Sequence, residues 1–306
     1  MSWLLGGLVF AGATACSSDD DTKSTKETEK APVENEVKVR RLTITEVEGD
    51  AADAKQALTR ATLAEDDGEL TASWKTGDGL TYCNLSSLDV MSGDIYTGPL
   101  TATKTAAISQ FTGDVTCSTN HYLAVVYPAT TFETNERYTI SLSGQDGTLS
   151  GLATSFHYVY GKAHVTSVTK TTATAEMVRM KSLLTVCKFS FKDKATGDAL
   201  PITMLEISYG GTGSDAGKYP QTATVAISDT TEPEDVHASG TNITAPLSIS
   251  ADGATEVYVA LLPTAAQRTF SFTVSDGSGN SYSGTAKATL TEGEYVEATG
   301  LKLTKQ

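Results

Sequence analysis

The side chain with the most defined chemistry in this sequence is the thiol of Cys16, which follows the small residues 13–15 (Ala-Thr-Ala). The ten uncharged residues 3–12 form an apolar segment that is too short to remain as a membrane-spanning helix. Small residues before a cysteine suit a lipoprotein signal peptidase, because the thiol must receive a lipid before the bond on its N-terminal side is cut. The pattern predicts a signal peptide over residues 1–15 and a lipid anchor on Cys16.

Cysteines also occur at positions 83, 117 and 187. Alternation along residues 183–191 places Cys187 on the same strand face as Phe189 and Phe191, which indicates a buried core thiol. Cys83 and Cys117 lie in neighbouring predicted strands. They could form one disulfide in an oxidising compartment, although their spacing does not fix the geometry that a disulfide needs.

The common catalytic and cofactor motifs are missing from the sequence. Its four histidines form neither an HExxH motif nor a cluster with cysteine at zinc-ligand spacing. No GxSxG motif is present, and residues 211–219 lack the first glycine and the Mg²⁺-binding hydroxyl of a phosphate-binding loop. We therefore expect a protein that is not an enzyme, without catalytic residues, a metal site or a cofactor.

Composition and charge narrow the class of protein. The chain has 306 residues, of which 39% are hydrophobic, and a formal net charge of −14. This length accommodates about two domains. An acidic chain lacks the basic face that a phosphate backbone requires, which argues against nucleic acid as a partner. Abundant Gly, Thr and Ser between short Val, Ile, Tyr and Phe runs are typical of an all-β protein.

The strands that must carry these residues are predicted to be antiparallel and to form two similar β-sandwich domains. Residues 16–36 are acidic and almost free of apolar side chains, so they form a flexible, disordered tether. Similar strand phrases then recur at near-constant spacing, namely 122–128 with 258–263, 138–144 with 270–275, and 149–151 with 282–284. We predict an N-terminal domain over 37–177 and a C-terminal domain over 178–306.

The first predicted strand begins just after the tether. Val37 and Val39, then Leu42 and Ile44, alternate with polar residues, with a shift of phase at Arg40-Arg41. The Ala-rich residues that follow, up to position 61, indicate an exposed loop or a short helix.

Several phrases in a fixed order carry a resemblance to a known family. They are Thr59-Arg60-Ala61-Thr62, Ser73-Trp74-Lys75-Thr76-Gly77-Asp78, Phe111-Thr112-Gly113, the strand 122–128 and Gly293-Glu294-Tyr295. Together with the cysteine motif they resemble the fimbrillin-like lipoproteins, subunits of type V pili of Gram-negative anaerobes. The resemblance implies two transthyretin-like domains and a pilus (fimbria) of many subunits. It also implies a lipid anchor in the outer membrane, exposure on the cell surface and a role in adhesion.

The resemblance also implies how the subunit would mature. In this family an Arg-specific surface protease removes the N-terminal segment with its first strand, and a strand from another subunit fills the groove by β-augmentation. Carried over to this sequence, the cut falls at Arg60-Ala61, and residues 37–44 are the displaced strand, which we expect at a sheet edge. Arg40 and Arg41 are alternatives, but a cut there would split that strand.

A second strand of interest lies near the C-terminus. Val296, Ala298, Leu301 and Leu303 alternate, and a shift of phase at Thr299-Gly300 predicts a bulge or a switch between sheets. These residues either form a donor strand for another subunit or close their own domain.

The main alternative hypothesis is a surface glycan-binding lipoprotein with tandem β-sandwich domains. Exposed aromatic side chains would then form a sugar platform, and Trp74 would be its only tryptophan in the chain after residue 16.

Overall fold

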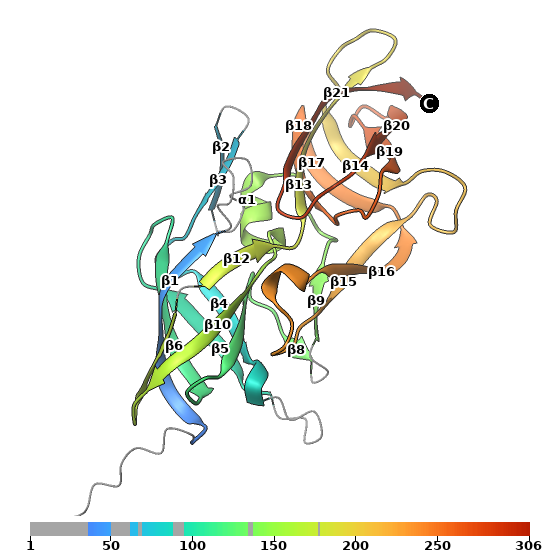
Figure 1. The fold of residues 1–306 in the computed structure, drawn as a ribbon. Coiled ribbons are helices and arrows are strands. Elements are labelled where there is room, and N and C mark those ends of the chain that lie inside the picture. The colour runs from blue at the N-terminus through green and yellow to red at the C-terminus, as the bar shows by residue number, and fades with distance from the viewer. Residues whose placement is uncertain (1–35, 50–61, 67–68, 88–94, 134–136, 177) are drawn as a thin grey trace, which may run out of the picture. The chain divides into compact units, whose positions relative to one another are not determined.

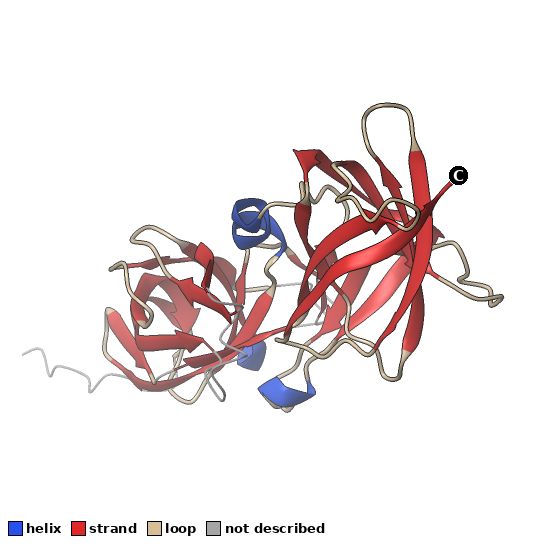
Figure 2. Cartoon of the chain, turned by 90° about the horizontal axis from the view of Figure 1, so that it is seen from above, coloured by secondary structure: helices blue, strands red, loops and turns tan. Residues whose placement is uncertain are grey.

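The computed structural model describes residues 36–49, 62–66, 69–87, 95–133, 137–176 and 178–306. Almost all regular structure in these ranges is β-strand, which confirms the all-β prediction (Figures 1 and 2). The helical turns are η1 (Leu85–Ser87), α1 (Leu149–Gly151), η2 (Leu152–Phe156) and η3 (Pro233–Asp235). No helix in the described ranges has the length and apolar character to cross a membrane.

The first sheet has eight strands and closes on itself. They are β1 (Lys38–Gly49), β4 (Gly79–Asn84), β5 (Thr97–Ala102), β6 (Ser109–Cys117), β7 (Tyr122–Tyr127), β10 (Val159–Val168), β11 (Thr172–Ala175) and β12 (Val178–Ser182). Their order is β11-β1-β12-β10-β7-β4-β5-β6. Because β1 also pairs with β6, the sheet forms a barrel.

The second sheet has seven strands in the order β17-β14-β19-β20-β21-β13-β18. They are β13 (Thr185–Asp193), β14 (Ile202–Tyr209), β17 (Leu247–Ala254), β18 (Glu256–Leu261), β19 (Arg268–Ser275), β20 (Ser281–Ala288) and β21 (Tyr295–Lys305). A four-stranded sheet joins β16 (Ala238–Ala245), β15 (Tyr219–Ala226), β9 (Arg137–Ser141) and β8 (Phe132–Glu133). A hairpin of β2 (Thr62–Asp66) and β3 (Glu69–Ser73) completes the described strands.

Strand β7 explains how two cores share the first sheet. Leu123 and Val125 contribute to the cluster inside the barrel, whereas Ala124 and Val126 contribute to a second cluster on the opposite face. A strand that is buried on both faces needs an unbroken apolar sequence, which is why residues 122–127 read Tyr-Leu-Ala-Val-Val-Tyr.

The second cluster continues into the seven-stranded sheet. Phe189, Phe191 and Phe272 pack there with ring centroids 5.2 to 6.1 Å apart. Cys187 is buried beside them, so its prediction as a core thiol is confirmed.

Strand pairing crosses the predicted domain boundary at 177/178 in two places. β12 follows the boundary in sequence but pairs with β10 and β1 in the first sheet. β9 precedes the boundary but pairs with β15. The division into domains 37–177 and 178–306 therefore stays a prediction. The hydrogen bonds of β12 assign this strand to the first sheet.

The predicted internal repeat is reproduced only in part. Both β7 and β18 are strands, but β9 pairs with β8 and β15 whereas β19 pairs with β14 and β20. The third pair of phrases differs in structure, because residues 149–151 form α1 and residues 282–284 lie in β20. The prediction of a strand at 149–151 is wrong. The Thr148 hydroxyl accepts a hydrogen bond from the Gly151 N–H at 2.9 Å and caps a helical turn instead.

Candidate functional site

The first strand, β1, has hydrogen-bonded neighbours on both sides (Figure 1). On one side, residues 38–44 run antiparallel to β6. On the other side, residues 41–44 run parallel to β11 and residues 47–49 run parallel to β12. The expectation of an edge strand is therefore wrong. β1 closes the barrel, and its removal would leave a slot with unpaired backbone groups on both walls.

Three apolar side chains of β1 point into the barrel. Leu42, Ile44 and Val47 have no exposed surface. Val37 and Val39, which were predicted to lie on the same strand as core residues, are 40% and 64% exposed. The predicted shift of phase at Arg40-Arg41 is also wrong, since the register shifts between Ile44 and Val47 instead.

Arg40 explains why the phase does not shift where the sequence indicated. It occupies the inward position two residues before Leu42 and is only 2% exposed. Its guanidinium donates to the Thr169 carbonyl at 2.9 Å, to the Glu36 carbonyl at 3.0 Å, to the Lys38 carbonyl at 3.3 Å, and to the Cys117 carbonyl. A polar residue can therefore continue the buried face of β1 because main-chain oxygens satisfy its donors.

Two side chains that interact electrostatically with the guanidinium, those of His121 and Cys117, are neutral. Burial, with the Arg40 charge as the second cause, lowers the pKa of His121. The Asn84 amide nitrogen lies 3.0 Å from His121 Nδ1 and donates, so Nδ1 accepts and the neutral ring carries its proton on Nε2. Burial raises the pKa of the Cys117 thiol to about 11, and Arg40 opposes this rise. The positive charge of Arg40 therefore meets carbonyl dipoles beside a thiol and a neutral ring.

The neighbouring arginine lies in a different environment. The Arg41 side chain is 57% exposed, lies 3.4 Å from the Asp114 carboxylate and donates to the Thr112 hydroxyl at 3.0 Å. Its backbone pairs with Asp114 on β6 and with Thr172 on β11. The two consecutive arginines thus form a natural comparison between a buried and an exposed guanidinium on one strand.

The C-terminal strand β21 lies inside its own sheet. It runs parallel to β13 and antiparallel to β20. Phe189 pairs with Ala298 and Phe191 with Leu301, so Thr299 and Gly300 oppose the single residue Ser190. The bulge predicted at Thr299-Gly300 is confirmed, and the Gly300 N–H donates to the Ser190 hydroxyl at 2.8 Å.

The alternating residues of β21 differ in burial. Leu303 is buried, whereas Val296, Ala298 and Leu301 are partly buried against the same cluster. With neighbours on both sides, β21 occupies the position of a closing strand. A copy donated to another subunit would leave a gap in the sheet that it came from.

Cys83 and Cys117 are not joined by a disulfide. Cys83 belongs to the cluster on the outer face of the first sheet, and Cys117 belongs to the cluster inside the barrel. The suggested disulfide between Cys83 and Cys117 is therefore wrong, because side chains on opposite faces of a sheet point away from each other.

Trp74 does not form part of an exposed sugar platform. Its side chain is 0% exposed and packs edge-on against Phe111 and Tyr127, with centroid distances of 4.9 and 5.7 Å. The tryptophan on which the glycan-binding hypothesis relied is a core residue.

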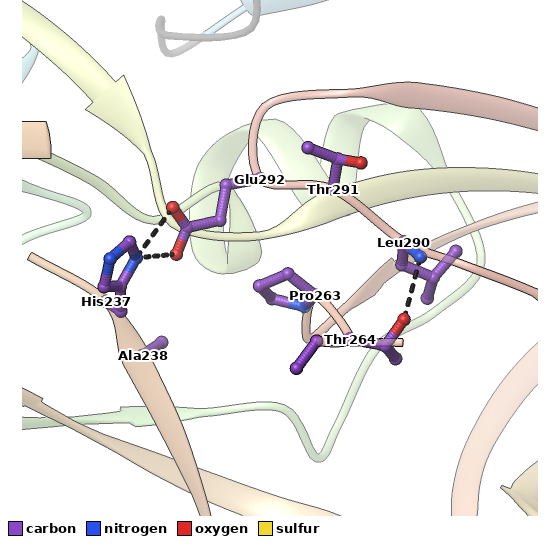
Figure 3. A pocket seen from close by; sticks show the side chains of 8 residues that line it. His237, Ala238, Pro263, Thr264, Leu290, Thr291 and Glu292 are labelled. Carbon is purple, nitrogen blue, oxygen red and sulfur yellow. Dashed lines mark hydrogen bonds and ion pairs between the residues drawn. The ribbon is translucent and has the colours of Figure 1, made fainter. Parts of the chain in front are cut away.

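A pocket of about 420 Å³ lies beside the start of β16 and the residues that follow β20, and Figure 3 shows side chains that line it. His237 Nδ1 lies 2.9 and 3.0 Å from the two carboxylate oxygens of Glu292, and Lys181 Nζ lies 2.8 Å from the same carboxylate. The Glu292 carboxylate thus forms an ion pair with Lys181 and lies within hydrogen-bond distance of His237. Within the described ranges, no group of three or more His, Cys, Asp or Glu side chains is arranged to hold a metal ion.

Cys16, Arg60 and Ala61 lie outside the described residues, so the lipidation and cleavage sites stay predictions.

The structure brings together Leu42 and Ile44 in the slot of β1, and it adds Arg40, which the sequence pattern did not identify as a slot residue. The sequence held one signal for Arg40, because residues 40, 42 and 44 are two positions apart and therefore lie on the same face of a strand. A long side chain with several donors can occupy an inward position where carbonyl groups are near.

No protein-family model and no curated protein matches the chain. Among solved structures, it is similar to a candidate cell adhesion protein from Bacteroides uniformis (16% identity, TM-score 0.48, covering 90% of this chain and 98% of that one). A fimbrial assembly protein from Parabacteroides distasonis shares 12% identity with a TM-score of 0.41, over 87% of this chain and 92% of that one. TM-scores of this size do not establish a shared fold, so function has to be inferred from the chain's own residues.

Proposed function

We propose that this protein is a structural subunit of a cell-surface pilus that serves adhesion. It is exported as a lipoprotein, held at the outer membrane through Cys16, cut by an Arg-specific surface protease at Arg60-Ala61, and assembled with other pilus subunits by strand exchange. The observation that supports this proposal is the position of β1, a single segment near the N-terminus that fills a two-sided slot in a closed barrel.

The physics of the slot favours replacement of β1 over its simple loss. Burial of Leu42, Ile44 and Val47 stabilises the barrel by about 1.5–3 kcal/mol for each side chain. The backbone groups of β6, β11 and β12 that face β1 would also lose their partners. A cut after residue 60 therefore leaves β1 bound until another strand with equivalent contacts takes its place, which is β-augmentation in trans.

The two arginines on β1 are poor protease sites in the folded chain. The Arg40 guanidinium is enclosed by four carbonyl groups, and Arg41 lies in backbone paired on both sides. A protease binds its substrate as an unpaired extended segment. This supports Arg60 as the maturation site, after which the remaining chain would begin at Ala61, one residue before β2.

The test is digestion of the folded chain with an Arg-specific protease, followed by N-terminal sequencing and sizing of the product. We expect a fragment that begins at Ala61 and polymerises with subunits that supply a strand for the slot, and we expect Arg60→Ala to abolish the cut. Arg41→Ala is the matched control and should leave the cut unchanged. A product that begins at Arg41 or Leu42, or a cut chain that stays monomeric in the presence of such subunits, would contradict the proposal.

A further inference from the structure

The acceptors of the Arg40 guanidinium fall into two groups when β1 is considered as a removable strand. The Glu36 and Lys38 carbonyls belong to the leaving segment. The Thr169 and Cys117 carbonyls belong to the barrel wall and remain when β1 leaves. The vacated slot would therefore contain two oxygens directed at the space that the Arg40 side chain fills.

The two wall carbonyls are held in place by the surrounding structure. Thr169 begins the turn between β10 and β11, where its N–H donates to the Thr172 carbonyl at 2.8 Å and its hydroxyl accepts from the Thr172 N–H at 2.9 Å. Cys117 ends β6 and is fully buried, and the backbone of the preceding Thr116 is held by the Asn84 and Tyr82 side chains, which stay in the barrel wall. An incoming side chain would meet these oxygens in a preset arrangement.

The chemistry of the pocket discriminates among side chains. An apolar side chain would bury both carbonyls without donors, and a carboxylate would meet two acceptors that it cannot bond. A lysine offers one compact ammonium, whereas an arginine offers a planar fork whose Nε and Nη groups already reach both oxygens. Donor geometry therefore favours arginine.

On the basis of the proposed strand exchange, we infer that the Thr169 and Cys117 carbonyls form a specificity pocket for an arginine of the strand that fills the slot. The pocket also sets the register of that strand. Apolar residues must follow the arginine at two, four and seven positions, as Leu42, Ile44 and Val47 follow Arg40. The partner is an extended segment with this pattern from another subunit, and a one-residue slip would place the arginine outside the barrel.

The experiment separates the pocket from the natural cleavage step. A recognition site for an unrelated protease is placed between residues 50 and 60 of the full chain, and the chain is cut there so that β1 stays bound. A fluorescent peptide of residues 36–49 is then added in excess, and its entry is followed by anisotropy. Matched peptides carry Arg40→Met, Arg40→Lys or Arg41→Met.

We expect the wild-type peptide to replace β1 and the Arg40→Met peptide to bind about 30-fold more weakly or worse, because two buried carbonyls lose a donor. The Arg40→Lys peptide should fall between them, and the Arg41→Met peptide should bind within about twofold of wild type, because Arg41 is an exposed surface side chain. Equal binding of the Arg40→Met and Arg41→Met peptides would overturn the pocket while leaving strand exchange intact. If no peptide enters the slot, strand exchange itself is overturned, and the pocket has no incoming strand to select.

Discussion

The side-chain amide of Gln145 pairs with the backbone of Ala260 in both directions. Gln145 Nε2 donates to the Ala260 carbonyl at 3.0 Å, and the Ala260 N–H donates to Gln145 Oε1 at 2.7 Å. The Gln145 side chain thus forms the same two hydrogen bonds with Ala260 that a neighbouring strand would form at the outer edge of β18. Tyr258 N–H donates to the Gly147 carbonyl at 2.8 Å beside it, so this edge is covered rather than open to another chain.

Replacement of Gln145 by leucine should destabilise the protein. Gln145 is buried and also donates to the Leu142 carbonyl at 2.9 Å, so the change leaves buried backbone groups without partners. We expect a loss of about 2–4 kcal/mol in the free energy of unfolding, measured by urea denaturation. Gln267→Leu, at an exposed position, is the control and should change this value by less than about 0.5 kcal/mol. Equal effects of the two changes would argue against the edge role of Gln145.

The docking of the β2–β3 hairpin on β13 should depend on pH. Lys188 Nζ lies 2.8 Å from the Glu65 carboxylate, which also accepts from the Tyr258 hydroxyl. The hydrogen bond from Lys188 lowers the pKa of Glu65, and the same bond raises the pKa of Lys188. The contribution of Glu65 is therefore present above its unfolded pKa, about 4.3, and is lost as pH falls through its lower folded pKa. That of Lys188 is present below about 10.4 and is lost as pH rises through its higher folded pKa.

Hydrogen exchange of the β2 and β3 amides measures this dependence. Protection should be constant between about pH 5 and 10 after correction for the intrinsic exchange rate, and should fall below that range. Glu65→Gln should remove the acid-side change. Glu133→Gln, on the exposed residue of β8, should leave it intact. The ion pair has no part in docking if Glu65→Gln keeps the wild-type profile.

Gly113 should not tolerate any side chain. It lies on β6 opposite Leu42, and a Cβ there would overlap the Pro99 carbonyl oxygen and lie 2.8 Å from Leu100 Cδ2. Gly113→Ala should push β5 away from β6 and cost about 1–3 kcal/mol in stability, seen as a lower midpoint of thermal unfolding. Gly213→Ala, where a Cβ would meet nothing within 4 Å, is the matched control. A Gly113→Ala chain as stable as the control would show that the close approach is not required.

The core cysteines should resist modification in the folded protein. Cys83, Cys117 and Cys187 are buried, and burial raises the pKa of the Cys117 and Cys187 thiols, so few reactive thiolates form near pH 8. Alkylation of the native chain followed by mass spectrometry should leave all three unmodified, whereas alkylation in denaturant should label all three. A non-reducing peptide map that finds Cys83 linked to Cys117 would contradict the structure.

The predictions that were confirmed came from local sequence patterns. Alternation identified Leu42 and Ile44 as inward residues of β1, and it grouped Cys187 with Phe189 and Phe191. A break in alternation located the bulge at Thr299-Gly300. These features depend on neighbours in sequence, because the two faces of a strand are set by its own repeat of two residues.

The alternation of residues within a strand could not predict which distant strands pair with it. The neighbours of β1 are β6, β11 and β12, which lie far along the chain, and two of these pairings are parallel. The sequence allowed Trp74 to be an exposed aromatic side chain of a sugar platform. In the structure, Phe111 and Tyr127 pack against it inside the barrel. Burial of an aromatic ring depends on which strands cover it, and one strand's sequence does not contain that information.

The sequence alone determined the all-β class, the acidic charge and the inward positions of Leu42 and Ile44, since composition and a two-residue period act within each segment. Tertiary structure decided that β1 closes a barrel and that Arg40 continues its buried face. The physical reason is that a guanidinium can be buried only where carbonyl groups satisfy it, and Thr169 and Cys117 reach Arg40 only after the sheet has closed.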